Sequence, residues 1–183
     1  MYIDEDNDQL PNHSTIYPIQ YFNFRSNKTS KPFLAAWNAH AFYIQQIRAL
    51  FNNCFFIYVK RDPIYNAFSI LNARKKIKGS INDWWSLKPK ECSEKTFNSP
   101  FYQVMSQIYY THKKIMEAKD DDFLTFDYDD ICSSPRTVLE VIGSMIRSNG
   151  YNFQTNYDHI PRYFCKSNPV IPYEWKKNLL EAH

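Results

Sequence analysis

One short segment restricts the possible folds of this chain more than any other. Cys54–Val59 is a continuous apolar run, rich in aromatic and β-branched side chains, and it ends abruptly at the sequence Lys-Arg-Asp-Pro at residues 60–63. Such a run predicts a strand that is buried on both faces of a parallel sheet. Asp62 can cap free backbone amides and Pro63 suits the first position of a helix. The strand should therefore lead directly into a helix that ends at about Ile77.

The rest of the chain supplies more segments of the same two kinds. Further strands are expected at Phe33–Trp37 and Phe123–Tyr128. The other expected helices cover Ala39–Phe51, Phe101–Lys119, Thr137–Arg147 and Tyr173–Ala182. The first thirty residues should be irregular, and Ile81–Cys92 should form a surface excursion. This order predicts a single α/β domain, residues 1–183, with a mainly parallel sheet flanked by helices. Ligands of such sheets bind beyond the carboxyl ends of the strands, here the corner at residues 60–63.

Glycine is scarce, and this limits how the chain can bind phosphate. The sequence has three glycines, at positions 79, 143 and 150, where an average chain of this size has about a dozen. Neither the dinucleotide-binding fingerprint nor the Walker A pattern can be built from them, because both place several glycines in one short turn. This argues against a nucleotide kinase or another phosphoryl transferase of that type. Any bound phosphate must be held by side chains and helix ends.

Charge and cysteine content exclude several other classes. The 22 Lys and Arg against 19 Asp and Glu give a net charge of +3, which is too small to indicate a nucleic-acid partner. The four cysteines lie far apart, with no Cys-x-x-Cys pair, so neither a zinc site nor a disulfide framework is expected. They fit a reducing cytosol without excluding a secretory lumen. The longest apolar run is too short to span a membrane and the acidic start is not a secretory signal, so a soluble protein is expected.

Residues 61–69 carry the strongest functional pattern. Arg61 follows the end of the predicted buried strand, and Ser69 lies eight residues later on the helix face that also carries Asp62 and Asn66. A guanidinium, a helix N-terminus and a hydroxyl can together form a glycine-free pocket for a dianionic phosphate. The alternative interpretation is a plain turn from strand to helix with an exposed arginine.

These residues resemble a motif of the sulfotransferases that use 3'-phosphoadenosine 5'-phosphosulfate (PAPS). In that family a strand ending in Arg-Asp-Pro, or a close variant, is followed by a serine eight residues after the arginine, as in Phe56–Pro63 with Ser69. A second block, Phe126–Ile131 followed by Pro135 and a helix, looks like the family's Tyr-Glu-Asp-Leu strand end, its proline and its helix. The resemblance covers approximately residues 32–148. It implies a sulfotransferase-like fold, related to that of the P-loop NTPases.

The resemblance also implies roles for single residues. Arg61 and Ser69 would hold the 3'-phosphate of PAPS or of its product, adenosine 3',5'-bisphosphate. Tyr128 would lie near the adenine, or would simply be a buried tyrosine at a strand end. His40 lies twenty-one residues before Arg61, close to the family spacing, and is the candidate catalytic base; the alternative is a histidine at a helix end with a local hydrogen bond. Position 36 is alanine where relatives have lysine.

Two regions depart from the family pattern or cannot be matched to it. Nothing in residues 1–31 resembles the family's first strand and phosphosulfate-binding loop, so the chain is either a fragment of a longer protein or lacks that half of the site. Arg162, Lys166 and Ser167 occupy the region where relatives often place a loop over the nucleotide, without a residue-by-residue match. The basic run Arg74–Lys78 either extends the nucleotide or acceptor site or is a solvated helix end.

Two functions follow as hypotheses. The first is a sulfotransferase that moves a sulfuryl group from PAPS to a hydroxyl or amine of a small-molecule or carbohydrate acceptor. The second is a non-catalytic remnant that binds adenosine 3',5'-bisphosphate, or a partner protein, through the surviving 3'-phosphate half site. The sequence predicts no particular acceptor and no particular oligomeric state.

Overall fold

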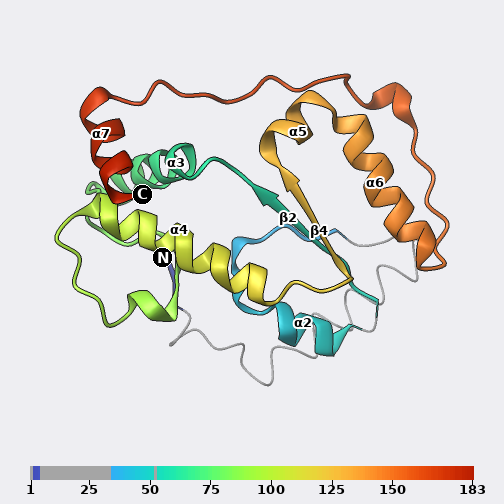
Figure 1. Cartoon of the computed structure of the whole chain (residues 1–183), viewed down its shortest axis with the longest axis horizontal. Coiled ribbons are helices and arrows are strands. Elements are labelled where there is room, and N and C mark those ends of the chain that lie inside the picture. The colour runs from blue at the N-terminus through green and yellow to red at the C-terminus, as the bar shows by residue number, and fades with distance from the viewer. Residues whose placement is uncertain (1, 5–33, 52) are drawn as a thin grey trace.

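A parallel pair of strands runs through the middle of the molecule and helices surround it (Figure 1). The structure is a computed structural model that describes residues 2–4, 34–51 and 53–183. The central strands are β2 (Phe56–Lys60) and β4 (Phe123–Asp127). The α-helices are α2 (Ile44–Leu50), α3 (Pro63–Lys78), α4 (Pro100–Glu117), α5 (Tyr128–Ser133), α6 (Pro135–Ser148) and α7 (Tyr173–Ala182). The predicted α/β class is confirmed, and the described part of the chain contains no helix long and apolar enough to cross a membrane.

Strands β2 and β4 confirm the prediction of parallel pairing but not that of a strand buried on both faces. Their register pairs Phe56 with Phe123 and Lys60 with Asp127. The side chains of Ile57 and Val59 are 38% and 44% exposed, so the face of β2 that carries them is open. That prediction is wrong because the described sheet that contains β2 has only two strands, which leaves one edge of β2 without a neighbour and less of its surface covered.

A second parallel pair forms where the sequence predicted no strand. Strand β1 (Tyr2–Asp4) pairs with β3 (Ser86–Lys88), so neither the start of the chain nor the segment 81–92 is wholly irregular. Three residues are too few to show a periodic pattern, and the two partners lie more than eighty residues apart. Pattern analysis therefore misses both strands.

The strand expected at Phe33–Trp37 is absent from residues 34–37, and Phe33 lies outside the described residues. Leu34 and Trp37 are 82% and 56% exposed, so none of the described strands or helices buries this apolar run. The predicted helix 39–51 is divided into a 3₁₀ helix, η1 (Asn38–Phe42), and α2.

The other predicted helices are confirmed to within about two residues, because their ends are set by local interactions. The carboxylate of Asp62 caps α3, the hydroxyl of Ser99 caps α4, and Gly79 ends α3 with a positive φ of 79°. Helices α3, α4 and α7 pack together at one end of the molecule (Figure 1). Their shared core consists of Ala67, Phe68, Leu71, Val104, Met105 and Leu179.

Arg74 belongs to this core, which corrects the interpretation of residues 74–78 as one continuous basic run. Its side chain is fully buried and donates hydrogen bonds to the side-chain oxygens of Gln103 and Gln107 on α4. Its guanidinium also lies 5.4 Å from the ring centroid of Trp84. Arg74 therefore joins α3 to α4 and is not available to an anionic substrate. Lys75, Lys76 and Lys78 remain exposed.

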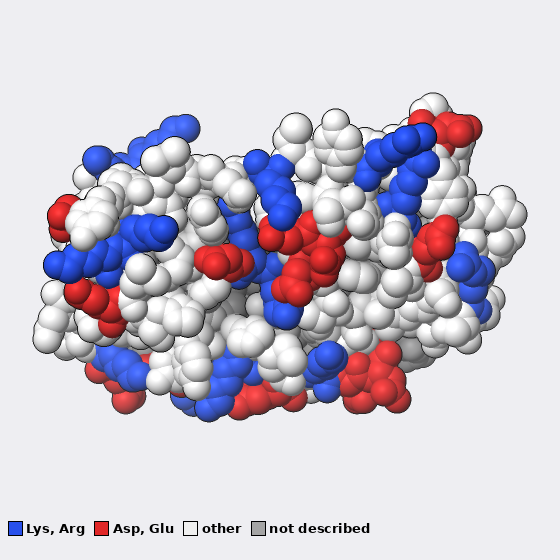
Figure 2. Space-filling model, turned by 45° about the horizontal axis from the view of Figure 1, so that its top comes forward, with Lys and Arg blue, Asp and Glu red and all other residues white. Residues whose placement is uncertain are grey.

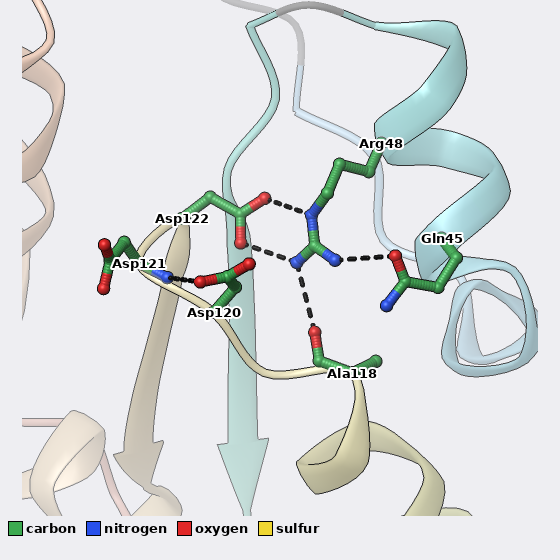
Figure 3. A network of polar contacts seen from close by, with 6 residues as sticks. All are labelled: Gln45, Arg48, Ala118, Asp120, Asp121 and Asp122. Carbon is green, nitrogen blue, oxygen red and sulfur yellow. Dashed lines mark hydrogen bonds and ion pairs between the residues drawn. The ribbon is translucent and has the colours of Figure 1, made fainter.

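A polar network at the opposite end of the sheet fixes α2 to the turn before β4 (Figure 3). Arg48 donates two hydrogen bonds of 2.7 Å to the carboxylate of Asp122, one from Nε and one from Nη2. The same guanidinium donates to Gln45 Oε1 at 2.9 Å and to the carbonyl of Ala118 at 3.1 Å. This network holds the amino end of the strand pair, far from the carboxyl end where a ligand is expected.

Candidate functional site

The two sequence blocks that carry the sulfotransferase resemblance meet at the carboxyl end of the strand pair. Because Lys60 of β2 is in register with Asp127 of β4, the residues that follow them, Arg61 and Tyr128, lie side by side. The guanidinium carbon of Arg61 is 4.9 Å from the centroid of the Tyr128 ring, within the range of a cation–π interaction. The resemblance implied that Arg61 holds a phosphate of the nucleotide and that Tyr128 either lies near its adenine or is a buried tyrosine at a strand end. The structure places the two residues side by side.

The extended tail between α6 and α7 passes over this pair. Arg61 Nη2 donates a hydrogen bond of 2.5 Å to the carbonyl oxygen of Ser167, and the amide of Ser167 lies 3.4 Å from the Tyr128 hydroxyl. Lys166 forms an ion pair of 2.9 Å with Asp129. Figure 1 shows the tail running from the end of α6 across the molecule to α7. Lys166 and Ser167, for which the sequence offered a region but no residue-by-residue match, thus lie against Asp129 and Arg61 respectively.

The N-terminus of α3 is not a free anion site, contrary to the expectation for this corner. One carboxylate oxygen of Asp62 accepts hydrogen bonds from the amides of Ile64 and Tyr65, at 2.8 and 3.2 Å. The amide of Asn66 bonds to the Asp62 carbonyl, and Pro63 has no N–H. All amides of the first turn are therefore in use, and a phosphate would reach them only by displacing Asp62.

Ser69 lies on the exposed face of α3, opposite the buried residues Ala67 and Leu71. It is six residues after Pro63, about 9 Å along the helix axis. Among the described residues no hydrogen bond joins Ser69 to Arg61, whose guanidinium is directed toward Tyr128 and Ser167. Ser69 therefore does not contact Arg61, the other predicted phosphate ligand. The role of Ser69 in phosphate binding stays a prediction.

His40 lies on η1, which packs against α4. Its ring is half-buried and meets the ring of Trp37 edge to face, with 5.7 Å between centroids. Burial lowers the pKa of His40 below its ordinary value of 6.5, which favours the neutral imidazole that a general base requires. His40, Arg61 and Tyr128 all line one long cleft beside β2. No direct contact joins His40 to Arg61 within the described part of the chain, and its catalytic role stays a prediction.

The charges at this end of the sheet are balanced. Lys60 is 3.3 Å from the carboxylate of Asp127, and Lys166 is paired with Asp129. Figure 2 shows Lys and Arg side chains interspersed with Asp and Glu over the face drawn. Arg61 differs from these two lysines because its hydrogen-bond partner among the described residues is a neutral carbonyl rather than a carboxylate. It is consequently the cation of this cluster with most capacity to accept a new anionic partner.

At the front of the chain the structure describes residues 2–4, which form β1. The expectation that residues 1–31 lack a phosphosulfate-binding loop otherwise falls on residues outside the described part of the chain. Comparison with known proteins gave no match to a family model, to a curated protein or to a solved structure.

Proposed function

We propose that this chain is a sulfotransferase-type domain that binds PAPS and transfers its sulfuryl group to a hydroxyl or amine. The observation that carries the proposal is the contact between Arg61 and Tyr128, which brings two separate sequence motifs to the carboxyl end of parallel strands. Ligands of α/β sheets bind at that end. The tail residues Lys166 and Ser167 lie over the same point, as a segment covering a nucleotide must.

In this proposal Arg61 holds the 3'-phosphate of the nucleotide. A phosphate oxygen replaces the carbonyl of Ser167 as the acceptor for the guanidinium, which exchanges a neutral acceptor for a charged one. The face of Tyr128 offers a stacking surface for the adenine. The acceptor oxygen or nitrogen forms a bond to sulfur as the bond from sulfur to the 5'-phosphate oxygen breaks, and the acceptor proton passes to His40. The acceptor is a small molecule or a carbohydrate.

The second hypothesis, a non-catalytic remnant, is favoured by one specific observation. The amides at the start of α3 are already bonded to Asp62, and Arg61 already has an acceptor. A domain that binds adenosine 3',5'-bisphosphate weakly, or that binds only a partner protein, would be compatible with this arrangement.

Isothermal titration of two nucleotides tests the proposal. Adenosine 3',5'-bisphosphate should bind the wild-type chain much more tightly than adenosine 5'-phosphate, because only the former carries the 3'-phosphate. Arg61→Ala should weaken the bisphosphate by about thirtyfold to a thousandfold. Arg61→Lys keeps the charge but loses the fork of donors, so its affinity for the bisphosphate should lie between those of the wild-type and Arg61→Ala proteins. Ser69→Ala should cost about 1 kcal/mol, since it removes one neutral hydroxyl.

Lys176→Ala, which removes an exposed cation from α7, is the matched control and should leave both affinities unchanged. Equal affinity of the wild-type chain for the two nucleotides would overturn the proposal. So would an Arg61→Ala protein that folds and binds the bisphosphate undiminished. A mass-spectrometric sulfation assay with PAPS then separates the hypotheses, because nucleotide binding without turnover indicates the remnant.

A further inference from the structure

The face of the central sheet that packs against α4 changes from apolar to charged along the strands. At the amino end the rings of Phe56 and Phe123 stack with 5.7 Å between their centroids. At the carboxyl end Lys60 pairs with Asp127 at 3.3 Å. Tyr58, whose neighbour in the register is Thr125, stands between these two levels. It therefore places a hydroxyl at the boundary between the apolar core and the polar site.

Tyr58 has a titratable partner on the helix above it. The Tyr58 hydroxyl lies 3.0 Å from Nδ1 of His112 on α4, and the two rings are 5.7 Å apart. Burial raises the pKa of Tyr58 above its ordinary value of 10, so the phenol stays protonated and can donate its hydrogen to Nδ1. Both side chains are half-buried and line the cleft beside β2.

Two further hydroxyls, one at the level of Tyr58 in the sheet and one on α4, have no hydrogen-bond partner in the described part of the chain. Thr125 Oγ1, in register with Tyr58, and Thr111 Oγ1, next to His112 in sequence, are both buried without a hydrogen bond to any described residue. Buried hydroxyls are nearly always bonded, to protein or to an ordered water or ligand. The unpaired hydroxyl of Thr125 therefore lies at the level of Tyr58 in the sheet.

The surroundings of the pair define the kind of molecule that fits. Ile44, Ile108 and Ile115 line the same cleft as Tyr58 and His112, so the walls are apolar. A flat apolar body with one hydroxyl matches such walls better than a sugar, which carries hydroxyls on all sides. In the tautomer whose Nδ1 accepts from the Tyr58 hydroxyl, this hydrogen bond of 3.0 Å ends on a ring lone pair to which the hydroxyl proton can pass.

We propose that Tyr58 and His112 form a proton-accepting pair that binds an aromatic alcohol between β2 and α4. The O–H bond of the ligand breaks and its proton passes to the Tyr58 oxygen, while the proton of Tyr58 passes to Nδ1 of His112. The ligand oxygen becomes an anion, His112 becomes a cation, and Tyr58 is unchanged in charge. If the reaction is sulfuryl transfer, which rests on the function proposed above, this pair activates the acceptor in place of His40.

Absorption spectroscopy of 4-nitrophenol tests the pair without any turnover, because its phenol and phenolate forms absorb at different wavelengths. At a pH below the pKa of the free phenol, the ligand bound to the wild-type chain should show the phenolate band. His112→Gln should bind it about tenfold more weakly, and in the phenol form. Tyr58→Phe should also lose the phenolate band, since it breaks the relay and leaves His112 in place.

Two control substitutions separate these effects from general ones. His159→Gln, on the short 3₁₀ helix η3 (Tyr157–His159), and Tyr163→Phe, in the tail, alter exposed residues and should behave as wild type. Thermal unfolding shows whether His112→Gln and Tyr58→Phe remain folded. The proposal is overturned if 4-nitrophenol does not bind the wild-type chain. A phenolate band that persists in a folded His112→Gln protein has the same consequence.

The outcome is independent of nucleotide binding. If adenosine 3',5'-bisphosphate fails to bind while 4-nitrophenol is deprotonated by the pair, the proposed sulfotransferase function fails and the pair stands. If the nucleotide binds and the phenol does not, the pair fails and the proposed function stands with His40 as its base.

Discussion

The guanidinium of Arg61 lies over the ring of Tyr128, with its carbon 4.9 Å from the ring centroid. The two residues are 67 positions apart in the sequence, yet each follows the last residue of a strand, and those last residues are paired in the parallel register. Parallel pairing thus converts two strand ends into one site. The proposed contacts of Arg61 and Tyr128 with the nucleotide depend on this relationship.

The ring of Tyr128 should matter more than its hydroxyl. Tyr128→Leu removes the cation–π interaction with Arg61 and the stacking surface, and should weaken adenosine 3',5'-bisphosphate by about two- to fivefold. Tyr128→Phe keeps the ring and loses only a long contact of 3.4 Å from the Ser167 amide, so its affinity should stay close to wild type. Isothermal titration measures both. A Tyr128→Phe protein as weak as Tyr128→Leu would assign the effect to the hydroxyl.

The Arg48–Asp122 network should contribute strongly to stability. Both side chains are less than one quarter exposed, and the guanidinium makes four hydrogen bonds. Arg48→Ala should lower the free energy of unfolding by about 1.5–3 kcal/mol. Arg48→Lys should recover less than half of this, because lysine lacks the planar fork. Urea unfolding monitored by circular dichroism measures these changes.

An exposed ion pair provides the control for that measurement. Lys113 and Glu117 are 3.8 Å apart on α4, with side chains 51% and 65% exposed. Lys113→Ala should change the free energy of unfolding by less than about 0.5 kcal/mol. Equal losses from Lys113→Ala and Arg48→Ala would contradict the structural role of the network.

Arg74 and its neighbour Lys75 should lose very different amounts of stability on the same substitution. Burial lowers the pKa of Arg74 to about 10, which still leaves it charged at neutral pH. Arg74→Met preserves much of the volume but leaves the side-chain oxygens of Gln103 and Gln107 without their donor, and should cost about 1–3 kcal/mol of stability. Lys75→Met alters an exposed position and should cost less than about 0.5 kcal/mol. Chemical unfolding of the two variants in parallel checks this, and a larger loss from Lys75→Met would refute the buried placement.

His40 should make the stability of the chain depend on pH below 6.5. Burial lowers the pKa of His40 in the folded state, so the unfolded state takes up a proton first as the pH falls. The free energy of unfolding should therefore decrease as the pH falls from 6.5 through the pKa of folded His40. His40→Gln should reduce this slope. Urea unfolding at a series of pH values measures it, and identical slopes for the two proteins would contradict the assignment.

Local sequence was sufficient where structure depends on neighbouring residues. The starts of α3 and α4 follow from Asp62-Pro63 and Ser99-Pro100, because a side-chain cap and a proline act within one turn of helix. Helix α6 begins at Pro135 without a side-chain cap from Ser134, so only the proline marks its start locally. Strands β2 and β4 follow from their apolar, aromatic composition. Their parallel pairing follows from the helices between them, since parallel strands require a crossover.

Tertiary structure decided everything that depends on residues far apart in the chain. Arg61 donates a hydrogen bond to Ser167, 106 residues later in the chain, and Arg74 donates to acceptors 29 and 33 residues later. A local sequence pattern, which covers about one helix or strand, cannot contain either contact. The exposure of Ile57 and Val59 depends on how many strands and helices reach the sheet, not on the strand itself. The sequence by itself determined which residues end the strands and begin the helices, because those interactions are short in range. Only the tertiary structure decided which of them are buried, paired or open to a ligand, because burial is a property of the assembled neighbours.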